Sequence, residues 1–175
     1  MKSSRSNQGF TMIEILVTVI ILGIAGAVVL PTLYSFREYE KLNGASKATV
    51  AWLDDLRRKA IQNSVPCRAT WDVATGVLSG KCDDEANASS TLDINNEIYG
   101  GIEDISITLS APTTEEDETE WIFTPRGTST TEREARLTLS NNTDHGRCIQ
   151  LTSPLGLVIA AKLTSTDECD YTSSY

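Results

Sequence analysis

The feature that most constrains this chain is an apolar segment of 21 residues near its N-terminus. From Phe10 to Leu30 the sequence FTMIEILVTVIILGIAGAVVL contains a single ionisable side chain, Glu14. At about 1.5 Å of rise per residue, a helix of this length spans roughly 30 Å, the thickness of a bilayer's hydrocarbon core. We therefore predict a transmembrane helix over residues 10–30 and one globular domain over residues 31–175.

The position of Glu14 inside this segment needs a physical reason. A carboxylate at the middle of a membrane helix costs about 2.5–3.5 kcal/mol on an insertion scale, and less near a helix end. A charge kept at that cost normally has a partner or a function, although a side chain that reaches to the lipid headgroups is an alternative. Glu14 is therefore the first candidate functional residue.

The residues before the apolar segment predict its orientation. Residues 1–9 contain Lys2 and Arg5 and no acidic residue. The N-terminus is therefore expected to stay in the cytoplasm, while the chain after Leu30 lies on the outer side of the membrane. A secretory signal peptide cleaved after Ala27 is a competing interpretation. The apolar run continues past that position, however, and the acid lies inside it.

The sequence GFTMIEILVTVIILGIAGAVVLP resembles the type IV prepilin signature, and Gly9, Phe10, Thr11 and Glu14 carry the match. The resemblance implies that residues 1–9 are a leader, that a prepilin peptidase cuts after Gly9, and that the new amino group of Phe10 is methylated. It also implies that Thr11 and Glu14 act in assembly. The Glu14 carboxylate would neutralise the ammonium of a neighbouring subunit inside an apolar packing of helices, where an unpaired ion is costly.

Beyond Pro31 the pattern becomes amphipathic. Small and apolar side chains recur at three- and four-residue steps, which places them on one face of a helix running to about residue 63. These positions are Leu42, Ala45, Thr49, Trp52, Leu53, Leu56 and Ala60. We expect this helix to continue the first one, with a kink at Pro31 and a break at Pro66. The basic residues 57–59 are expected to complement the helix dipole.

After Pro66 the sequence has β character. Short segments with alternating apolar residues are bounded by Gly, Pro, Asn and Ser. They are Cys67–Cys82, as a hairpin, followed by Ile102–Ser110, Glu120–Thr124, Ala135–Ser140, Arg147–Thr152 and Leu157–Lys162. A curved antiparallel sheet on the Trp52 face of the helix would bury both apolar surfaces. The expected fold class is therefore α+β and pilin-like, with a long N-terminal helix packed on an antiparallel sheet.

The four cysteines predict two disulfides, because the domain is expected outside the cytoplasm. Three pairings are possible. Pairing Asp72 with Val77 around a four-residue turn brings Cys67 opposite Cys82, and Cys148 and Cys169 then form the second bond. Each closed loop contributes about 3 kcal/mol in the chain-entropy model. A zinc site is disfavoured because no two cysteines are closely spaced.

The C-terminal half extends the resemblance. The sequences WIFTPRG, ARLTLS and RCIQLTSPLGLVIAAK resemble the sheet of the GspH/FimT pseudopilins, and LDDLRRKAIQNSVPC resembles the end of their long helix. That group consists of minor subunits of type IV pili or type II secretion pseudopili. Some members bind DNA through basic residues after the glycine of the last hairpin. Here Leu157, Val158 and Ile159 follow Gly156, so the resemblance does not extend to DNA binding.

Charge and composition give little support to other functions. The net charge of −9 opposes nonspecific attraction to DNA or anionic lipid. Four arginines could still form a local patch, although acidic residues are interleaved: they are Arg126, Arg133, Arg136 and Arg147. The acidic run Thr113–Glu120 is interpreted as a solvated loop, with a weak cation site as the alternative. Asp83–Asn96 is interpreted as a flexible connection.

The sequence contains no nucleophile elbow, phosphate loop or metal-spaced histidine pair, and its single histidine, His145, is placed in a turn. We therefore expect no enzymatic activity, cofactor or metal. The expected function is that of a minor pilin or pseudopilin in filament assembly. A DNA-binding minor pilin or a surface adhesin is the alternative. The expected partners are prepilin peptidase, other pilins and the inner-membrane assembly machinery. The expected location is the inner membrane, and then a pilus or periplasmic pseudopilus.

Overall fold

A computed structural model describes residues 10–83, 89–94, 105–110, 120–139, 142–164 and 168–172 of the chain. The chain divides into two compact units, Met1–Arg37 and Glu38–Tyr175, which are considered separately below. The first unit contains the beginning of helix α1 (Met12–Asn63), and the second contains the rest of that helix and all the strands.

Helix α1 ends close to the position that the sequence predicts. Its last residue is Asn63, and Ser64 follows with a left-handed φ of 55°. The amide of Ser64 donates to the carbonyl of Ile61 at 3.3 Å, and the amide of Val65 donates to that of Ala60 at 3.3 Å. These two bonds form a Schellman cap, which satisfies carbonyls that would otherwise be left without a partner.

The basic residues before this cap do not act on the helix dipole as expected, because none of them lies in the last turn. Arg57 instead donates from Nε to the carbonyl of Gly127 at 2.7 Å and from Nη2 to that of Leu155 at 3.1 Å. Lys59 forms an ion pair with Asp55 at 2.8 Å. The arginine therefore ties two turns of the strand region to the helix.

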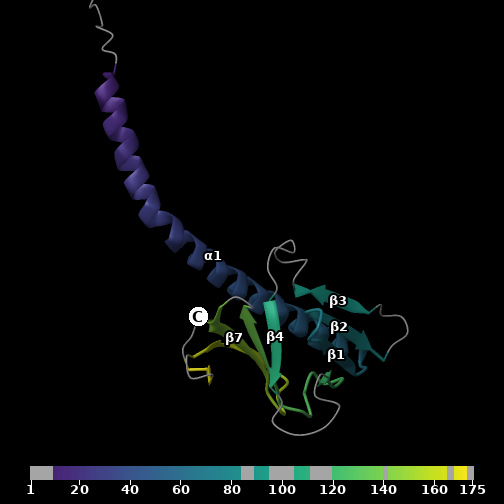
Figure 1. Cartoon of the computed structure of the whole chain (residues 1–175). Helices are drawn as coiled ribbons and strands as arrows, with labels where there is room; N and C mark the ends of the chain where they lie inside the picture. The colour runs from purple at the N-terminus through teal and green to yellow at the C-terminus, as the bar shows by residue number, and fades with distance from the viewer. Residues whose placement is uncertain are drawn as a thin grey trace, which may run out of the picture. The chain divides into compact units, whose positions relative to one another are not determined.

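The strands form two antiparallel sheets, one with the order β3-β2-β1-β5 and one with the order β4-β6-β7-β8-β9. Figure 1 shows the last part of α1 passing alongside strands of both sheets. In chain order the strands are β1 (Cys67–Asp72), β2 (Val77–Cys82), β3 (Ser90–Asp93), β4 (Ile105–Ser110), β5 (Glu120–Phe123), β6 (Arg133–Leu139), β7 (Asn142–Leu151), β8 (Val158–Leu163) and β9 (Cys169–Asp170). The predicted α+β class is confirmed, with two sheets in place of one.

The first hairpin has the predicted register. Strands β1 and β2 pair so that Asp72 lies opposite Val77 and Cys67 lies opposite Cys82. The Asp72 carboxylate accepts hydrogen bonds from the amides of Ala74 and Thr75 at 3.0 and 3.4 Å. These bonds within the turn, with a hydrogen bond from the Thr75 side chain as the largest cause, lower the pKa of Asp72.

One apolar core joins α1 to both sheets. The helix contributes the predicted face, of which Leu42, Leu53 and Leu56 are almost completely buried. Alternate residues of β1, β5, β6 and β7 complete the core. Trp71 and Trp121 pack together there with their ring centroids 5.2 Å apart. The two sheets are therefore held together through the side chains that they share with the helix.

Two sequence interpretations are wrong. Asp83–Asn96 contains strand β3, which pairs with β2 through four residues, so part of the predicted flexible connection is ordered. His145 lies in strand β7 and not in a turn, because β7 begins at Asn142 and a bulge at Thr138/Leu139 lets it pair with β6. Most of the acidic run Thr113–Glu120 lies outside the described residues.

We predict that Leu53→Ala lowers the free energy of unfolding by about 2–5 kcal/mol, because it leaves a cavity where helix and sheets meet. Leu53 is fully buried. Urea denaturation followed by tryptophan fluorescence would measure the change. The matched control is Val73→Ala, an exposed position in the first hairpin turn, where surface substitutions change stability by about 0.5 kcal/mol or less. Equal effects of the two changes would contradict the core described above.

Candidate functional site

The residues that carry the prepilin resemblance lie at the start of α1, apart from Gly9, which is outside the described residues. Phe10 precedes the helix and is 78% exposed. Thr11 is the N-cap: its carbonyl accepts from the amide of Glu14 at 3.1 Å and from that of Ile15 at 3.3 Å. Its side-chain oxygen lies 3.4 Å from the amide of Glu14. The helix therefore starts two residues after Phe10.

Thr11 and Glu14 have the spacing of a capping box, a feature that the sequence analysis missed. In this motif a threonine caps the helix and a glutamate three residues later completes the first turn. An acidic side chain in that turn also interacts favourably with the positive end of the helix dipole. The four letters TMIE carry the signal. Part of the reason for an acid at position 14 is therefore local.

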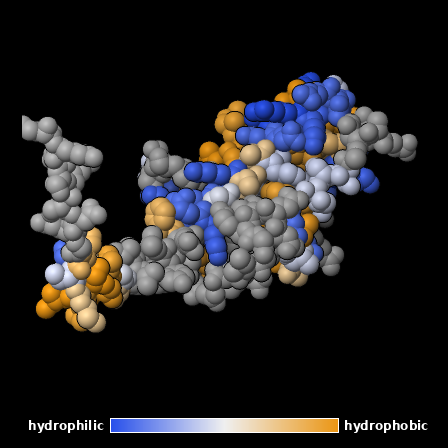
Figure 2. Space-filling view, turned by 90° about the horizontal axis from the view of Figure 1, so that it is seen from above, coloured by the Kyte–Doolittle hydropathy of each residue, from blue (hydrophilic) through white to orange (hydrophobic). Residues whose placement is uncertain are grey.

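The Glu14 side chain is exposed, and it has no ion-pair partner among the residues that the structure describes. The apolar side chains around it are exposed as well. They are Phe10, Met12, Ile13, Ile15, Leu16, Val17, Val19, Ile20, Ile21, Leu22 and Ile24. Figure 2 shows this segment as a group of orange residues at the lower left. A helix that is apolar all round requires cover, which lipid or other helices can provide.

In the part of the chain that is described, no helix combines the length and the apolar character needed to cross a membrane. The transmembrane span over residues 10–30 therefore stays a prediction.

The structure contains the two disulfides expected from the sequence, Cys67–Cys82 and Cys148–Cys169. The first belongs to the apolar core. The second lies on the opposite face of its sheet, because Ile149 points into the core and successive residues of a strand alternate. The second bond therefore ties the C-terminal segment to the outer face of β7.

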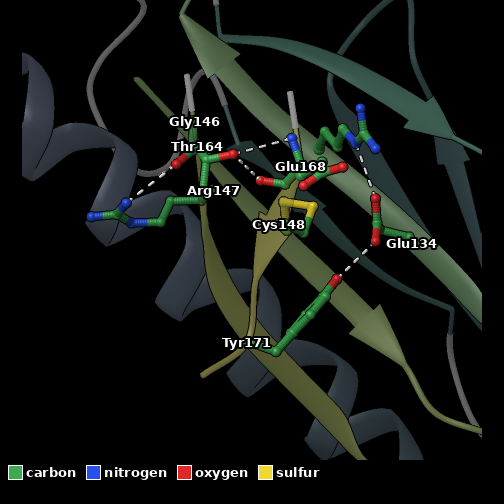
Figure 3. Close-up of a disulfide and its surroundings, with 9 residues drawn as sticks. Glu134, Gly146, Arg147, Cys148, Thr164, Glu168 and Tyr171 are labelled. Carbon is green, nitrogen blue, oxygen red and sulfur yellow. Dashed lines mark hydrogen bonds and ion pairs between the residues drawn. A yellow bond between two sulfur atoms is a disulfide. The ribbon is translucent and has the colours of Figure 1, made fainter. Parts of the chain in front are cut away.

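A polar group surrounds the second disulfide on this outer face (Figure 3). The Tyr171 hydroxyl donates to Glu134 Oε2 at 2.9 Å, and Arg136 Nε donates to Glu134 Oε1 at 3.0 Å. Partial burial, followed by this hydrogen bond, raises the pKa of Tyr171 above its ordinary value. Glu134 also lies close to the sulfurs of Cys148 and Cys169. Because these sulfurs are bonded to each other, they offer no thiolate to a metal.

Three of the four arginines named above as a possible basic patch point in different directions. Arg126 is exposed in a turn, and Arg136 is paired with Glu134 on the outer face. Arg147 is 3% exposed and points the other way, toward α1. Its Nε donates to Asn43 Oδ1 at 2.8 Å, and its guanidinium lies 4.6 Å from the centre of the Tyr39 ring. Strand alternation thus puts Arg136 and Arg147 on opposite faces of the sheet, which opposes a single patch.

Residues 4–30 match the family model described as the prokaryotic N-terminal methylation motif. The matched region includes Gly9, Phe10, Thr11 and Glu14. A search of curated proteins finds no match.

Solved structures share the fold. The type IV minor pilin FimU of Pseudomonas aeruginosa strain PAO1 is 17% identical, covering 78% of this chain and 97% of that chain, with a TM-score of 0.55. The globular unit therefore has a pilin-like fold. The minor pseudopilin EpsH from the Type 2 Secretion System of Vibrio cholerae is 9% identical, covering 70% of the pilin-like chain and 97% of its own, with a TM-score of 0.51. Both matches show that the fold is shared.

We predict that Tyr171→Phe changes how the stability of the pilin-like domain depends on pH. The folded state keeps the phenol neutral, which raises the pKa of Tyr171. The contribution of this hydroxyl to the free energy of unfolding is therefore complete below the unfolded pKa of about 10, and it is lost as pH rises further. Urea midpoints measured from pH 9 to about 11 should therefore fall more steeply for the original chain than for the variant. Parallel curves would contradict the role assigned to burial of this hydroxyl.

Proposed function

We propose that this chain is a minor pilin or pseudopilin, a structural subunit of a type IV pilus or of a type II secretion pseudopilus that acts in filament assembly. The observation that carries the proposal is the methylation motif over residues 4–30, directly joined to a pilin-like domain. The uncovered apolar side chains that follow the motif support it, because a filament of packed helices or a bilayer would cover them.

In this proposal prepilin peptidase cuts between Gly9 and Phe10 and methylates the new amino group. The removed leader contains Lys2 and Arg5 and no acid, so the net side-chain charge changes from −9 to −11. The cut also places a new ammonium group at Phe10, close to the capped start of α1. The helix then begins almost at the new terminus.

Assembly uses the attraction between this ammonium and the Glu14 carboxylate of a neighbouring subunit. Both ions would lie among apolar side chains, where breaking a pair by removing one partner costs about 3–5 kcal/mol. The absence of a cation near Glu14 among the described residues supports a partner outside the chain. Thr11 contributes by fixing the helix start, and thereby how far the Phe10 ammonium of each subunit lies from the Glu14 carboxylate of the same subunit.

The subunit is anchored in the inner membrane with its N-terminus in the cytoplasm before extraction into the filament. Its partners are prepilin peptidase, other major and minor pilins and the assembly machinery. The DNA-binding alternative is not favoured, because apolar residues follow Gly156 and the arginines point in different directions. No cofactor or catalytic step enters the proposal.

We predict that the mature protein, purified from its host, begins with N-methylated Phe10. Mass spectrometry of the N-terminal peptide would identify it. A mature chain that begins with Val28 would instead show cleavage by ordinary signal peptidase, and the proposed processing would then be wrong.

We further predict that Glu14→Gln lowers incorporation into filaments by tenfold or more, since a lost buried pair costs about 3–5 kcal/mol. Glutamine at this position still completes a capping box, so the change tests the charge and not the helix start. The matched control is Thr18→Ala, one turn further along the same face, where the hydroxyl only bonds the Ile15 carbonyl. If the glutamine variant entered filaments as well as the original chain, the proposed charge pairing would be wrong, and Glu14 would act only in capping its own helix.

A further inference from the structure

The exposed apolar side chains of the globular unit are concentrated at one place. In residues 38–175, the described large apolar residues that are exposed are Ile61, Val73, Leu155, Leu157 and Ile159. Three of them, Leu155, Leu157 and Ile159, belong to the β7–β8 hairpin, which meets α1 where Arg57 bonds the Leu155 carbonyl and where Ile159 lines a groove with the helix; we call this region the α1–β8 seam. Single exposed apolar residues are ordinary on a protein surface, whereas a group on one seam indicates a contact surface.

The seam contains a groove of about 480 Å³. Its floor and walls come from Val50 and Ala51 of the helix and from residues 158–160 of β8. Lys47 and Asp54 line it as well, and neither has an ion-pair partner among the described residues. The groove therefore offers an apolar centre together with one free charge of each sign.

The edge of β8 beside this groove is open over four residues. On the side away from β7, strand β9 pairs only with Lys162 and Leu163, so Val158–Ala161 have no strand partner within the described residues. Natural edge strands normally carry a charge, a proline or a bulge that prevents pairing with another chain. The sequence VIAA at this edge has none of these. It is therefore a template for the addition of a strand.

The hairpin that presents this edge is held in place. Arg57 bonds the carbonyls of Gly127 and Leu155, and the amide of Gly156 donates to the carbonyl of Thr152 at 2.8 Å. The amide of Thr152 in turn donates to the carbonyl of Leu157 at 2.9 Å. Because the hairpin is already ordered, a partner would meet a small entropic cost on docking.

We propose that the α1–β8 seam binds an extended segment of a neighbouring, non-identical filament subunit, which adds as a strand to the free edge of β8. Main-chain hydrogen bonds to Val158–Ala161 would hold the segment, and its apolar side chains would enter the groove. We expect the docking segment to carry an acidic residue that faces Lys47 and a basic residue that faces Asp54. This inference rests on the proposed function for the identity of the partner.

A second copy of this chain does not have the required charge pattern at its own β8. The apolar sequence LGLVIAA there is followed by Lys162, whereas the nearest acidic residue before it is Asp144, far back in β7. One copy could therefore supply the base for Asp54 but not the acid for Lys47. The charges favour a different subunit.

Photo-crosslinking in the native host tests the proposal with the full chain. A benzoylphenylalanine residue replaces Ile159, which is 40% exposed, or Val73, which is 43% exposed and lies outside the seam. The expected result is a several-fold higher adduct yield at position 159. The linked peptide should be an extended apolar segment of another pilin-like subunit that carries an acid and a base. Equal yields at the two positions, or an adduct with a second copy of this chain, would overturn the proposal.

A blocking substitution provides a second measurement. With the crosslinker at position 157, Ile159→Lys should lower the adduct yield several-fold, because a charge on an edge strand opposes pairing. Val73→Lys, the matched control, should leave it unchanged. Both variants should keep the original urea midpoint and a methylated Phe10. An unchanged adduct yield in Ile159→Lys would contradict the binding proposed for the α1–β8 seam and leave the proposed function intact. An unmethylated Phe10 in the original chain would instead contradict the proposed function.

Discussion

The structure depends on how the apolar side chains of one helix are covered. Between Leu42 and Ala60 the chain covers them itself, with alternate residues of both sheets. From Phe10 to Ile24 the described residues leave them exposed. The same helix therefore has one half that is part of a folded domain and one half that requires an apolar environment from outside. Lipid and a bundle of neighbouring helices both meet that requirement, so the proposed anchoring and the proposed assembly can use the same residues.

In the second sheet, side-chain alternation puts core packing on one face and the attachment of the C-terminal segment on the other. Ile149 and Leu151 of β7 point into the core, while Cys148, directly before Ile149, points to the outer face. That outer face is occupied by the disulfide and by the Glu134–Tyr171 hydrogen bond. The C-terminal segment is thus fixed without using any core side chain. Among the residues that the structure describes, the adjoining edge of β8 stays open over Val158–Ala161, because β9 pairs only with Lys162 and Leu163.

Strong periodicity made much of this fold predictable. The helix face and the first hairpin register follow from side-chain spacing, and that register alone brings Cys67 opposite Cys82. The number of sheets was not predictable in this way, because alternation identifies the buried face of a strand but not its neighbours. Strand β3 was missed since its four residues include one apolar side chain, Leu92. The start of β7 was missed because its polar residues NTDH resemble a turn; of these four only Asn142 has a partner in β6, beyond a bulge.

The sequence predicted which residues form the candidate site, but it only partly predicted how the Glu14 charge is stabilised there. Glu14 stood out because a carboxylate among apolar residues is costly, yet its first-turn position reduces that cost. A favourable dipole interaction contributes about 0.3–1 kcal/mol, against the insertion cost of about 2.5–3.5 kcal/mol that applies at a helix centre. The capped first turn can therefore hold the carboxylate in a single subunit without removing the advantage of a cationic partner. In the proposed filament, the remaining cost is what makes pairing with the next subunit's ammonium favourable.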